Sequence, residues 1–343
     1  MIRCRSIATD KPASRTPLAG KLCFLMTSIL FLLFPGSASA VTQLNVITAL
    51  SSNDPMYKGL EEFKRLVEQN SQRSIEIRLF LGSQLGNDDD MLEQAMLGAN
   101  VAVLADAGRL SIYQHELGIL SAPYLVRDAN ELKTLVTSPL FANWAETLAR
   151  EDELHIFSFN WWQGARHLLT QKKVTEPADL DSVRMRTIGM PVWIETIRAM
   201  GATPTPLSWS EVYSGLQQKV IDAAEAQFTG MWGARLYEVV SHVTKTGHIQ
   251  LLSGLVGSKK WFDALTPKQQ KVVTQAAIKA GDHASDLVRH AEASIVLELK
   301  EKGVEVTDID TNAFEQATRS VYPKLGYAKL HQQVQAYLQE PGR

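Results

Sequence analysis

The sequence contains very little cysteine: its only two cysteines, Cys4 and Cys23, both lie within the first 40 residues. The rest of the chain can therefore form no disulfide and no thiolate metal site, so burial of apolar side chains must stabilise the fold. The histidines are scattered. His115-Glu116 begins like a zincin motif, but Ile119 stands where the second imidazole would be. We expect no metal ion and no other cofactor.

Enzyme signatures and basic charge are also scarce. The chain has no Gly-x-Ser-x-Gly, no Gly-x-Gly-x-x-Gly and no P-loop pattern. Residues 41–343 carry 30 Lys and Arg against 36 Asp and Glu, a net charge of about −6, which excludes a typical nucleic-acid-binding surface. Beyond residue 40, no apolar run approaches the roughly 20 residues of a spanning helix. We therefore expect a soluble mature protein that is not an enzyme.

The amino terminus has the pattern of a secretory signal. Five basic residues precede an apolar run at residues 22–34, interrupted only by Thr27 and Ser28, and the small residues of 37–40 follow it. This arrangement predicts export, with cleavage after Ala40 and removal of residues 1–40. The alternative, an uncleaved anchor, is disfavoured because the run is shorter than a spanning helix. Cys23 precedes most of the apolar run, so a lipid-anchored cysteine is not expected.

Short apolar strands alternate with amphipathic helices in the first half of the remaining chain. The expected strands cover residues 44–49, 74–81 and 101–105, and the expected helices cover residues 55–69 and 88–97. The second helix begins with three aspartates, which suit the positive end of a helix dipole better than a cation site. This alternation predicts α/β layering.

The same pattern returns in the second half. A strand at residues 183–188 leads into a helix at residues 191–200, which Gly201 is well placed to end. Residues 265–303 are expected to be mostly one long helix. About 300 residues exceed the usual size of a single core, so two lobes are expected.

A further helix start is expected near Trp209. Ser208 and Glu211 have the spacing of a capping box, with Ser208 as the N-cap. Trp209 would then project from the start of a helix. Helix starts in α/β lobes often border ligand clefts, because their free amides stabilise anions.

Three stretches, in this order and spacing, resemble one protein family. They are residues 82–92 (GSQLGNDDDML), residues 186–218 (RTIGMPVWIETIRAMGATPTPLSWSEVYSGLQQ) and residues 220–225 (VIDAAE). The chain resembles the dicarboxylate-binding (DctP) proteins of tripartite ATP-independent periplasmic (TRAP) transporters. The resemblance implies a two-lobed periplasmic-binding-protein-like receptor that closes over an organic acid and is located in the periplasm. It also implies delivery of that acid to the small and large membrane subunits of a secondary transporter driven by an ion gradient.

We expect the lobes to be discontinuous in sequence. Lobe I is expected to comprise residues 41–163 and 252–291. Lobe II is expected to comprise residues 164–251 and 292–343, including the carboxyl-terminal helices. The ligand cleft would lie between them.

The resemblance places a carboxylate-gripping arginine at Arg186 and a second one at Arg166. Guanidinium suits this role because its planar, paired donors match a carboxylate. The alternative for Arg186 is a surface salt bridge. Arg184, two residues earlier on the same strand, is expected to be solvent-exposed.

Three further residues are candidates for contacting the ligand. Trp209 matches a position where the family has an aromatic that packs on the ligand, although it could instead belong to the core between the lobes. Asp106 follows the third strand, where the family often places a polar contact. Trp162, with Trp161 beside it, could line the cleft or the hinge. Asn53 and Asp54, at the start of the first helix, are expected to cap that helix and not to contact the ligand.

One departure from the family pattern concerns the carboxylate itself. The family usually has Glu-Asn-Pro where this chain has Glu225, Ala226 and Gln227. We expect Glu225 and Gln227 at the site, with Gln227 supplying the amide that Ala226 lacks. If Gln227 does not reach, the ligand is expected to be bulkier or more aromatic than a simple dicarboxylate.

Two other functions stay open at this stage. A periplasmic sensory receptor would bind an organic acid with the same residues but present it to a signalling protein. A periplasmic hydrolase or lyase would use Glu225 together with a histidine.

Overall fold

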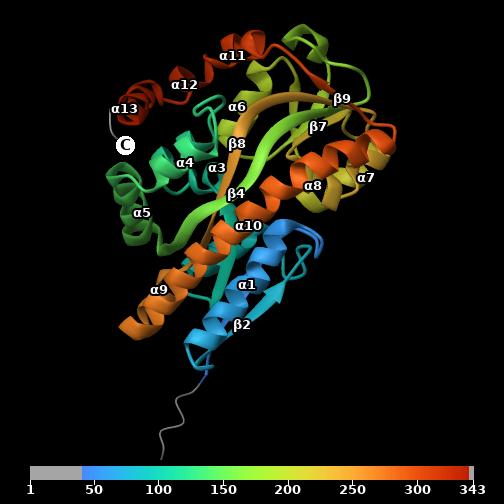
Figure 1. Cartoon of the computed structure of the whole chain (residues 1–343). Coiled ribbons are helices and arrows are strands. Elements are labelled where there is room, and N and C mark those ends of the chain that lie inside the picture. The colour runs from blue at the N-terminus through green and yellow to red at the C-terminus, as the bar shows by residue number, and fades with distance from the viewer. Residues whose placement is uncertain (1–40, 340–343) are drawn as a thin grey trace, which may run out of the picture. The chain divides into compact units, whose positions relative to one another are not determined.

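The computed structural model of the chain describes residues 41–339 (Figure 1). The predicted signal segment and its cleavage site lie outside the described residues. Within those residues, no helix combines the length and apolar composition that a membrane span requires.

The described residues form one sheet of nine strands in the order β2-β1-β3-β8-β4-β7-β5-β6, with β9 also paired to β8. The strands are β1 (Thr42–Ile47), β2 (Ile75–Phe80), β3 (Val101–Asp106), β4 (Leu154–Thr170), β5 (Arg184–Thr187), β6 (Thr203–Pro206), β7 (Ala223–Ala226), β8 (His242–Ser258) and β9 (Glu305–Asp308). The predicted α/β class is confirmed, because helices are interspersed with these strands throughout the chain.

The helices of eight or more residues are α1 (Pro55–Asn70), α2 (Asp88–Met96), α4 (Ala129–Val136), α5 (Pro139–Asp152), α6 (Pro191–Ala199), α10 (Pro267–Glu301) and α13 (Ala328–Leu338). Shorter helices are α3 (Ala107–Leu110), α7 (Val212–Gln217), α8 (Phe228–Gly233), α9 (Lys259–Asp263), α11 (Asn312–Thr318) and α12 (Val321–Lys324). Four 3₁₀ helices complete the set: η1 (His115–Ser121), η2 (Pro177–Leu180), η3 (Trp209–Glu211) and η4 (Leu236–Glu238).

Two long antiparallel strands, β4 and β8, connect the two ends of the sheet. Each has 17 residues, and their register shifts at four places along their length. The parallel strands β1, β2 and β3 extend from the carboxyl-terminal half of β8, while β5, β6 and β7 extend from the carboxyl-terminal end of β4. We call these the first and second strand groups.

The predicted helix boundaries are largely confirmed. Asp54 caps α1 by accepting a hydrogen bond from the Met56 amide, and Pro55 occupies the first turn. Gly201 follows α6 with φ of +102°, a left-handed conformation that glycine adopts most readily. Asn87 caps α2 ahead of its three aspartates.

The predicted capping box near Trp209 is wrong. Ser208 makes no side-chain cap hydrogen bond, and residues Trp209–Glu211 form one 3₁₀ turn. The turn is closed by the Glu211 amide, which donates to the main-chain carbonyl of Ser208. The main chain thus satisfies this turn, and α7 begins only at Val212.

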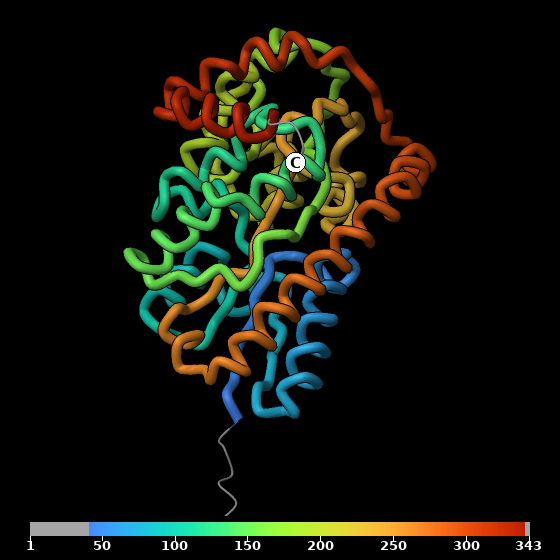
Figure 2. The backbone as a smooth tube through the Cα atoms, turned by 60° about the vertical axis from the view of Figure 1, so that its left-hand side comes forward, coloured from blue at the N-terminus to red at the C-terminus, as the bar shows by residue number. Residues whose placement is uncertain are grey.

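Helix α10 is the predicted long helix, and it contacts both α1 and β4 (Figures 1 and 2). Its start has a true capping box, because Thr266 and Gln269 bond each other's backbone amides. The close approach of α1 needs Gly59, where an added Cβ would lie 2.6 Å from the Cβ of Ala284 and 2.8 Å from Trp161. Ordinary core packing therefore joins helices more than 200 residues apart in sequence.

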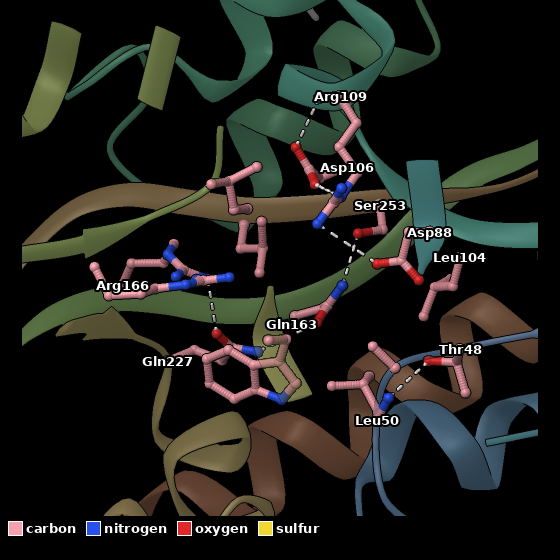
Figure 3. Close-up of a pocket in the computed structure, with 15 residues that line it drawn as sticks. Thr48, Leu50, Asp88, Leu104, Asp106, Arg109, Gln163, Arg166, Gln227 and Ser253 are labelled. Atoms are coloured by element: carbon pink, nitrogen blue, oxygen red, sulfur yellow. Dashed lines mark hydrogen bonds and ion pairs between the residues drawn. The ribbon is translucent and has the colours of Figure 1, made fainter. Parts of the chain in front are cut away.

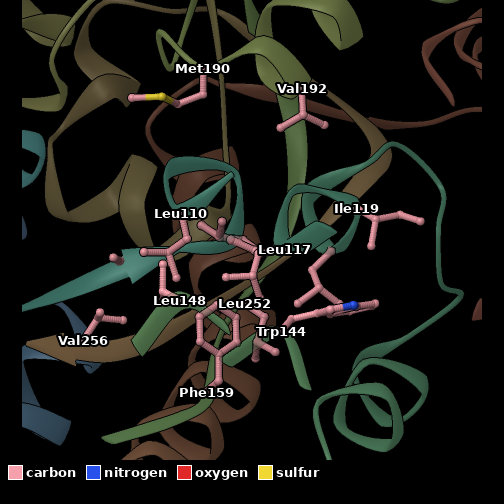
Figure 4. Packing of buried hydrophobic residues seen from close by; sticks show 14 of the residues in the cluster. Leu110, Leu117, Ile119, Trp144, Leu148, Phe159, Met190, Val192, Leu252 and Val256 are labelled. Carbon is pink, nitrogen blue, oxygen red and sulfur yellow. The ribbon is translucent and has the colours of Figure 1, made fainter. Parts of the chain in front are cut away.

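A second core connects the carboxyl-terminal helices to the body of the protein. Trp144, Leu148 and Phe159 pack together in this cluster (Figure 4). Tyr322 and Val334 from α12 and α13 belong to the same cluster. Helix α12 also contacts α6, and α13 contacts α4 and η1.

Candidate functional site

A polar pocket lies where β4 and β8 meet the carboxyl ends of four parallel strands (Figure 3). Ligands commonly bind at this edge of α/β sheets. Its wall comprises residues that follow β1, the first residue of α2, the ends of β3 and β5, and side chains of β4 and β8. They are Thr48, Ala49, Leu50, Asp88, Leu104, Asp106, Arg109, Gln163, Arg166, Arg186, Ile188, Trp209, Gln227, Leu251 and Ser253.

Arg186 presents a buried guanidinium with uncommitted donors. It is 2% exposed, its Nε donates to the main-chain carbonyl of Leu207 at 2.9 Å, and its guanidinium carbon lies 5.4 Å from the ring centre of Trp209. No acceptor among residues 41–339 receives a hydrogen bond from its two terminal nitrogens. Burial lowers the pKa of Arg186 to about 9. Such a group is stabilised by an anion, and a carboxylate matches its two free nitrogens.

Arg184, on the same strand as Arg186, is exposed and ion-paired. Its side chain is 48% exposed and forms an ion pair of 2.8 Å with Asp222. The prediction that Arg184 is solvent-exposed is confirmed. The surface-salt-bridge alternative for Arg186 is wrong, because Arg186 is buried and has no salt bridge within the described part of the chain.

Arg166 is largely committed to protein partners. Its Nε and Nη2 donate to a carboxylate oxygen and to the main-chain carbonyl of Glu225, and its Nη1 donates to Gln227 Oε1 at 3.1 Å. Its guanidinium carbon lies 5.0 Å from the ring centre of Trp193. A guanidinium has five N–H donors, so three are used and two are left for a ligand.

Glu225 lies behind Arg166 and does not line the pocket. It is fully buried, and burial by itself raises the pKa of the carboxyl, but Arg166 and His248 together outweigh this effect and the pKa is lowered. His248 Nε2 lies 3.7 Å from Glu225 Oε2, and His248 Nδ1 lies 2.8 Å from the hydroxyl of Thr246. His248 is also fully buried and outside the pocket wall, so this pair orients Arg166 and does not face a bound molecule.

Gln227 does reach the pocket. Its Nε2 donates to Gln163 Oε1 at 3.2 Å, and Gln163 Nε2 donates to Ser253 Oγ at 2.6 Å. Gly230 leaves room for this side chain, since an added Cβ there would lie 2.8 Å from Gln227 Nε2. Ala226, the last residue of β7, is instead buried in an apolar core. A neutral amide chain thus extends from Arg166 along the pocket floor.

The end of β3 and the first turn of α2 contribute an acidic wall around Arg109 of α3. Its guanidinium forms ion pairs with Asp106 at 3.2 Å, Asp89 at 2.5 Å and Asp88 at 3.6 Å. Asp106 Oδ1 also accepts hydrogen bonds from the Arg109 amide and from Trp193 Nε1. Asp88 Oδ1 is buried and receives no hydrogen bond from residues 41–339. Burial raises the pKa of Asp88 to about 6.

The pocket brings together five of the seven residues proposed from the sequence: Arg186, Arg166, Trp209, Asp106 and Gln227. Trp209 is half-buried. Trp162 lies elsewhere, in a second pocket between α4 and α10, where its Nε1 donates to Gln250 at 3.1 Å. Trp161 is fully buried in the core.

Arg109 and Gln163 also line the pocket although neither was predicted from the sequence, and Asp88 was predicted only as part of a helix start. The spacing of Asp106 and Arg109, three residues apart, was a usable signal for an ion pair. No sequence pattern connected Gln163 to Ser253, because β4 and β8 bring them together across 90 residues.

Comparisons with known proteins agree on one family. A model described as bacterial extracellular solute-binding protein, family 7, matches residues 46–329. The 2,3-diketo-L-gulonate-binding periplasmic protein YiaO of Escherichia coli K12 is 28% identical over 286 residues, which cover 83% of this chain and 87% of the relative.

Solved structures of TRAP periplasmic solute-binding proteins share the fold. One from Escherichia fergusonii, in an open ligand-free form, is 44% identical, with a TM-score of 0.77, and the match covers 86% of this chain and 99% of that one. One from Actinobacillus succinogenes 130Z, with bound L-galactonate, is 32% identical, with a TM-score of 0.83, and the match covers 87% and 99%.

Proposed function

Because the chain belongs to family 7 of the bacterial extracellular solute-binding proteins, the receptors of TRAP transporters, we propose that its pocket holds an organic acid by gripping the carboxylate with Arg186. The observation that carries this proposal is the buried guanidinium of Arg186 with two uncommitted terminal nitrogens. The solved relatives bind ligands that include L-galactonate, L-fuconate and D-glucuronate, each of which carries one carboxylate.

The other residues are proposed to act around that contact. Arg166, oriented by Glu225, supplies its two remaining N–H groups to the carboxylate. Trp209 packs against the ligand, while Asp106 and Gln227 accept or donate hydrogen bonds along its length. We propose no ligand contact for Glu225 or for Trp162.

We propose that the molecule closes by rotation of two lobes about β4 and β8. The proposed division assigns residues 41–163 and 252–291 to lobe I and residues 164–251 and 292–343 to lobe II. Gly164, with φ of +109°, lies at a register shift between β4 and β8 and at the proposed boundary. A ligand that contacts Arg186 on one side and Asp106 on the other would favour the closed state, since it binds that state with more contacts.

We further propose that the chain is exported, loses residues 1–40 and delivers its ligand to the membrane subunits of a TRAP transporter. A sensory receptor would use the same pocket, so uptake distinguishes the two. Deletion of the gene should abolish uptake of the bound acid if the protein serves transport.

Ligand-dependent thermal stability tests the carboxylate proposal directly. A ligand present at 1,000 times its dissociation constant adds about 4 kcal/mol to the stability of the folded state. We expect organic acids to raise the melting temperature and matched neutral polyols to leave it unchanged, with L-galactonate and galactitol as the first pair. Equal shifts from the acid and from the polyol would contradict the role of Arg186.

A further inference from the structure

We propose that this pocket selects monocarboxylates whose far end carries hydrogen-bond donors, and that Asp88 rejects acids with a second carboxylate at that end. The inference rests on the proposed function, since it takes the first carboxylate to be held by Arg186. It adds a specificity-determining residue and a ligand class.

Arg166 lies on one side of the pocket and Asp88 and Asp106 lie on the other, and the charge of Arg186 interacts with all three. Figure 3 shows Arg166 and Gln227 on one side and Arg109, Asp106 and Asp88 on the other. A ligand that places its carboxylate at the first side therefore extends its other end toward the second.

Arg109 offers no free positive charge to a second carboxylate. Three aspartates, Asp88, Asp89 and Asp106, already lie within ion-pair distance of its guanidinium. Together these four side chains carry a net charge of −2 when ionised. A ligand carboxylate placed here would meet more negative than positive charge, and such juxtaposition costs binding free energy.

Asp88 is the member of this cluster with a buried oxygen that receives no hydrogen bond from the described residues. Both oxygens of Asp106 are occupied by Arg109, and Oδ1 also accepts from Trp193, whereas Oδ1 of Asp88 is buried without any donor from residues 41–339. A buried acceptor left unpaired is costly, so a ligand group that donates to it is favoured. Hydroxyl and ammonium groups both donate, whereas a carboxylate does not.

The middle of the pocket favours a hydroxylated carbon chain. Leu104, Ile188 and Leu251 supply apolar contact, while Thr48 and Ser253 supply hydroxyls between them. The Thr48 oxygen accepts from the Leu50 amide, which leaves its own proton free to donate. A carbon chain that bears hydroxyl groups can contact the apolar side chains and also form hydrogen bonds with Thr48 and Ser253.

Calorimetric titration of the purified protein, expressed from the full chain, tests the inference at pH 8, where Asp88 is ionised. The ligands share a carboxylate at one end and differ at the other. L-galactonate and galactarate share a carbon skeleton and differ only in that galactarate has a second carboxylate in place of a terminal CH₂OH. We expect L-galactonate to bind about 100-fold more tightly than galactarate, from the cost of like charges brought together. Hexanoate should bind more weakly than L-galactonate, because it leaves the acceptor unpaired.

Binding of 6-aminohexanoate distinguishes whether the group that donates to Asp88 is an ammonium or a hydroxyl. If it binds more tightly than L-galactonate, the donor that Asp88 receives is an ammonium. If it binds more weakly, the donor is a hydroxyl. Both results support selection for a donor, whereas equal affinities for hexanoate, 6-aminohexanoate and L-galactonate overturn it.

Asp88→Asn removes the charge with little change in shape, and its amide can donate to a carboxylate. We expect the variant to narrow the preference for L-galactonate over galactarate by about tenfold or more. Asp90→Asn is the matched control, because Asp90 is exposed on the same helix turn and outside the pocket; it should leave the ratio unchanged. An unchanged ratio in Asp88→Asn would overturn the assignment of Asp88.

The results also separate the two proposals. Galactarate binding as tightly as L-galactonate in the wild type overturns the selectivity alone, because both are gripped by a carboxylate. Binding of no acid in the panel, or of galactitol as tightly as L-galactonate, overturns the proposed function and the selectivity with it.

Discussion

Replacing Arg186 with methionine should weaken ligand binding and at the same time stabilise the ligand-free protein. Methionine has a similar reach and carries no charge, so the change removes the guanidinium while filling much of its space. The two opposite effects follow from one cause, the burial of a cation that has no carboxylate partner until a ligand arrives.

The cost that Arg186 imposes on the empty protein can be worked from its burial. Each unit of pKa corresponds to about 1.4 kcal/mol, so the fall from 12.5 to about 9 represents about 5 kcal/mol of unfavourable environment. The variant also loses the hydrogen bond to the Leu207 carbonyl, worth about 1 kcal/mol, and the contact with the Trp209 ring, worth about 1 kcal/mol. We expect a net gain of about 1–3 kcal/mol in the free energy of unfolding.

The expected loss in affinity is larger. Truncating one partner of a buried, hydrogen-bonded charge pair costs about 2–5 kcal/mol, which corresponds to a loss between about 30-fold and several thousand-fold. Arg186→Lys should lie between the variant and the wild type, because lysine keeps the charge but loses the paired donors.

Urea unfolding without ligand and calorimetry with the tightest-binding acid, L-galactonate in the first trial, measure the two effects. Arg184→Met is the control, since this exposed ion pair on the same strand contributes at most about 1 kcal/mol. The reasoning is refuted if Arg186→Met lowers the unfolding free energy by 2 kcal/mol or more, or if it changes affinity less than fivefold.

Three further predictions concern stability. Burial raises the pKa of Asp54 from 3.8 to about 6, so wild-type stability falls as the pH rises from about 4 to 6. Asp54→Asn should therefore raise the free energy of unfolding, measured with urea, by up to about 3 kcal/mol at pH 7.5 and by little at pH 4. An equal gain at both pH values would show that burial of the ionised carboxylate is not the cause. Gly59→Ala should lower the free energy of unfolding by about 1–3 kcal/mol, and with it the melting temperature, because the new Cβ would lie 2.6 Å from that of Ala284. This loss is expected even though alanine is the better helix former. A higher melting temperature would show that the two helices separate freely. Glu225→Gln should lower the free energy of unfolding by about 3 kcal/mol at pH 7, because it leaves Arg166 buried without its carboxylate partner. Since the pKa of Glu225 is lowered, the difference in this free energy between variant and wild type should shrink as the pH falls below 4.5. A pH-independent difference, again by urea unfolding, would show that the charge of Glu225 is not the cause.

Local patterns in the sequence were sufficient for most elements of the fold. The alternation of Ile75 and Ile77 with polar residues predicted β2, and Asp54 and Gly201 marked helix ends, because capping and left-handed turns depend on residues within one turn. The prediction at Ser208 was wrong because a capping-box spacing is compatible with a main-chain 3₁₀ turn that uses no side-chain bond.

The site was only partly accessible to the same reasoning. Arg186 and Arg166 were named through family resemblance, and the structure places both in the pocket wall. The resemblance did not distinguish a guanidinium with free donors from one held by Glu225, because that difference arises where β4 pairs with β7.

By itself, then, the sequence determined the α/β class and the ends of most helices, since these depend on neighbouring residues. Tertiary structure alone decided which groups face one another. The antiparallel pairing of β4 with β8 brings Gln163 to Ser253, and the approach of α2 to β3 brings Asp88 to Arg109. Charge compensation and burial depend on such contacts between distant segments, and these set which donors and acceptors stay free for a ligand.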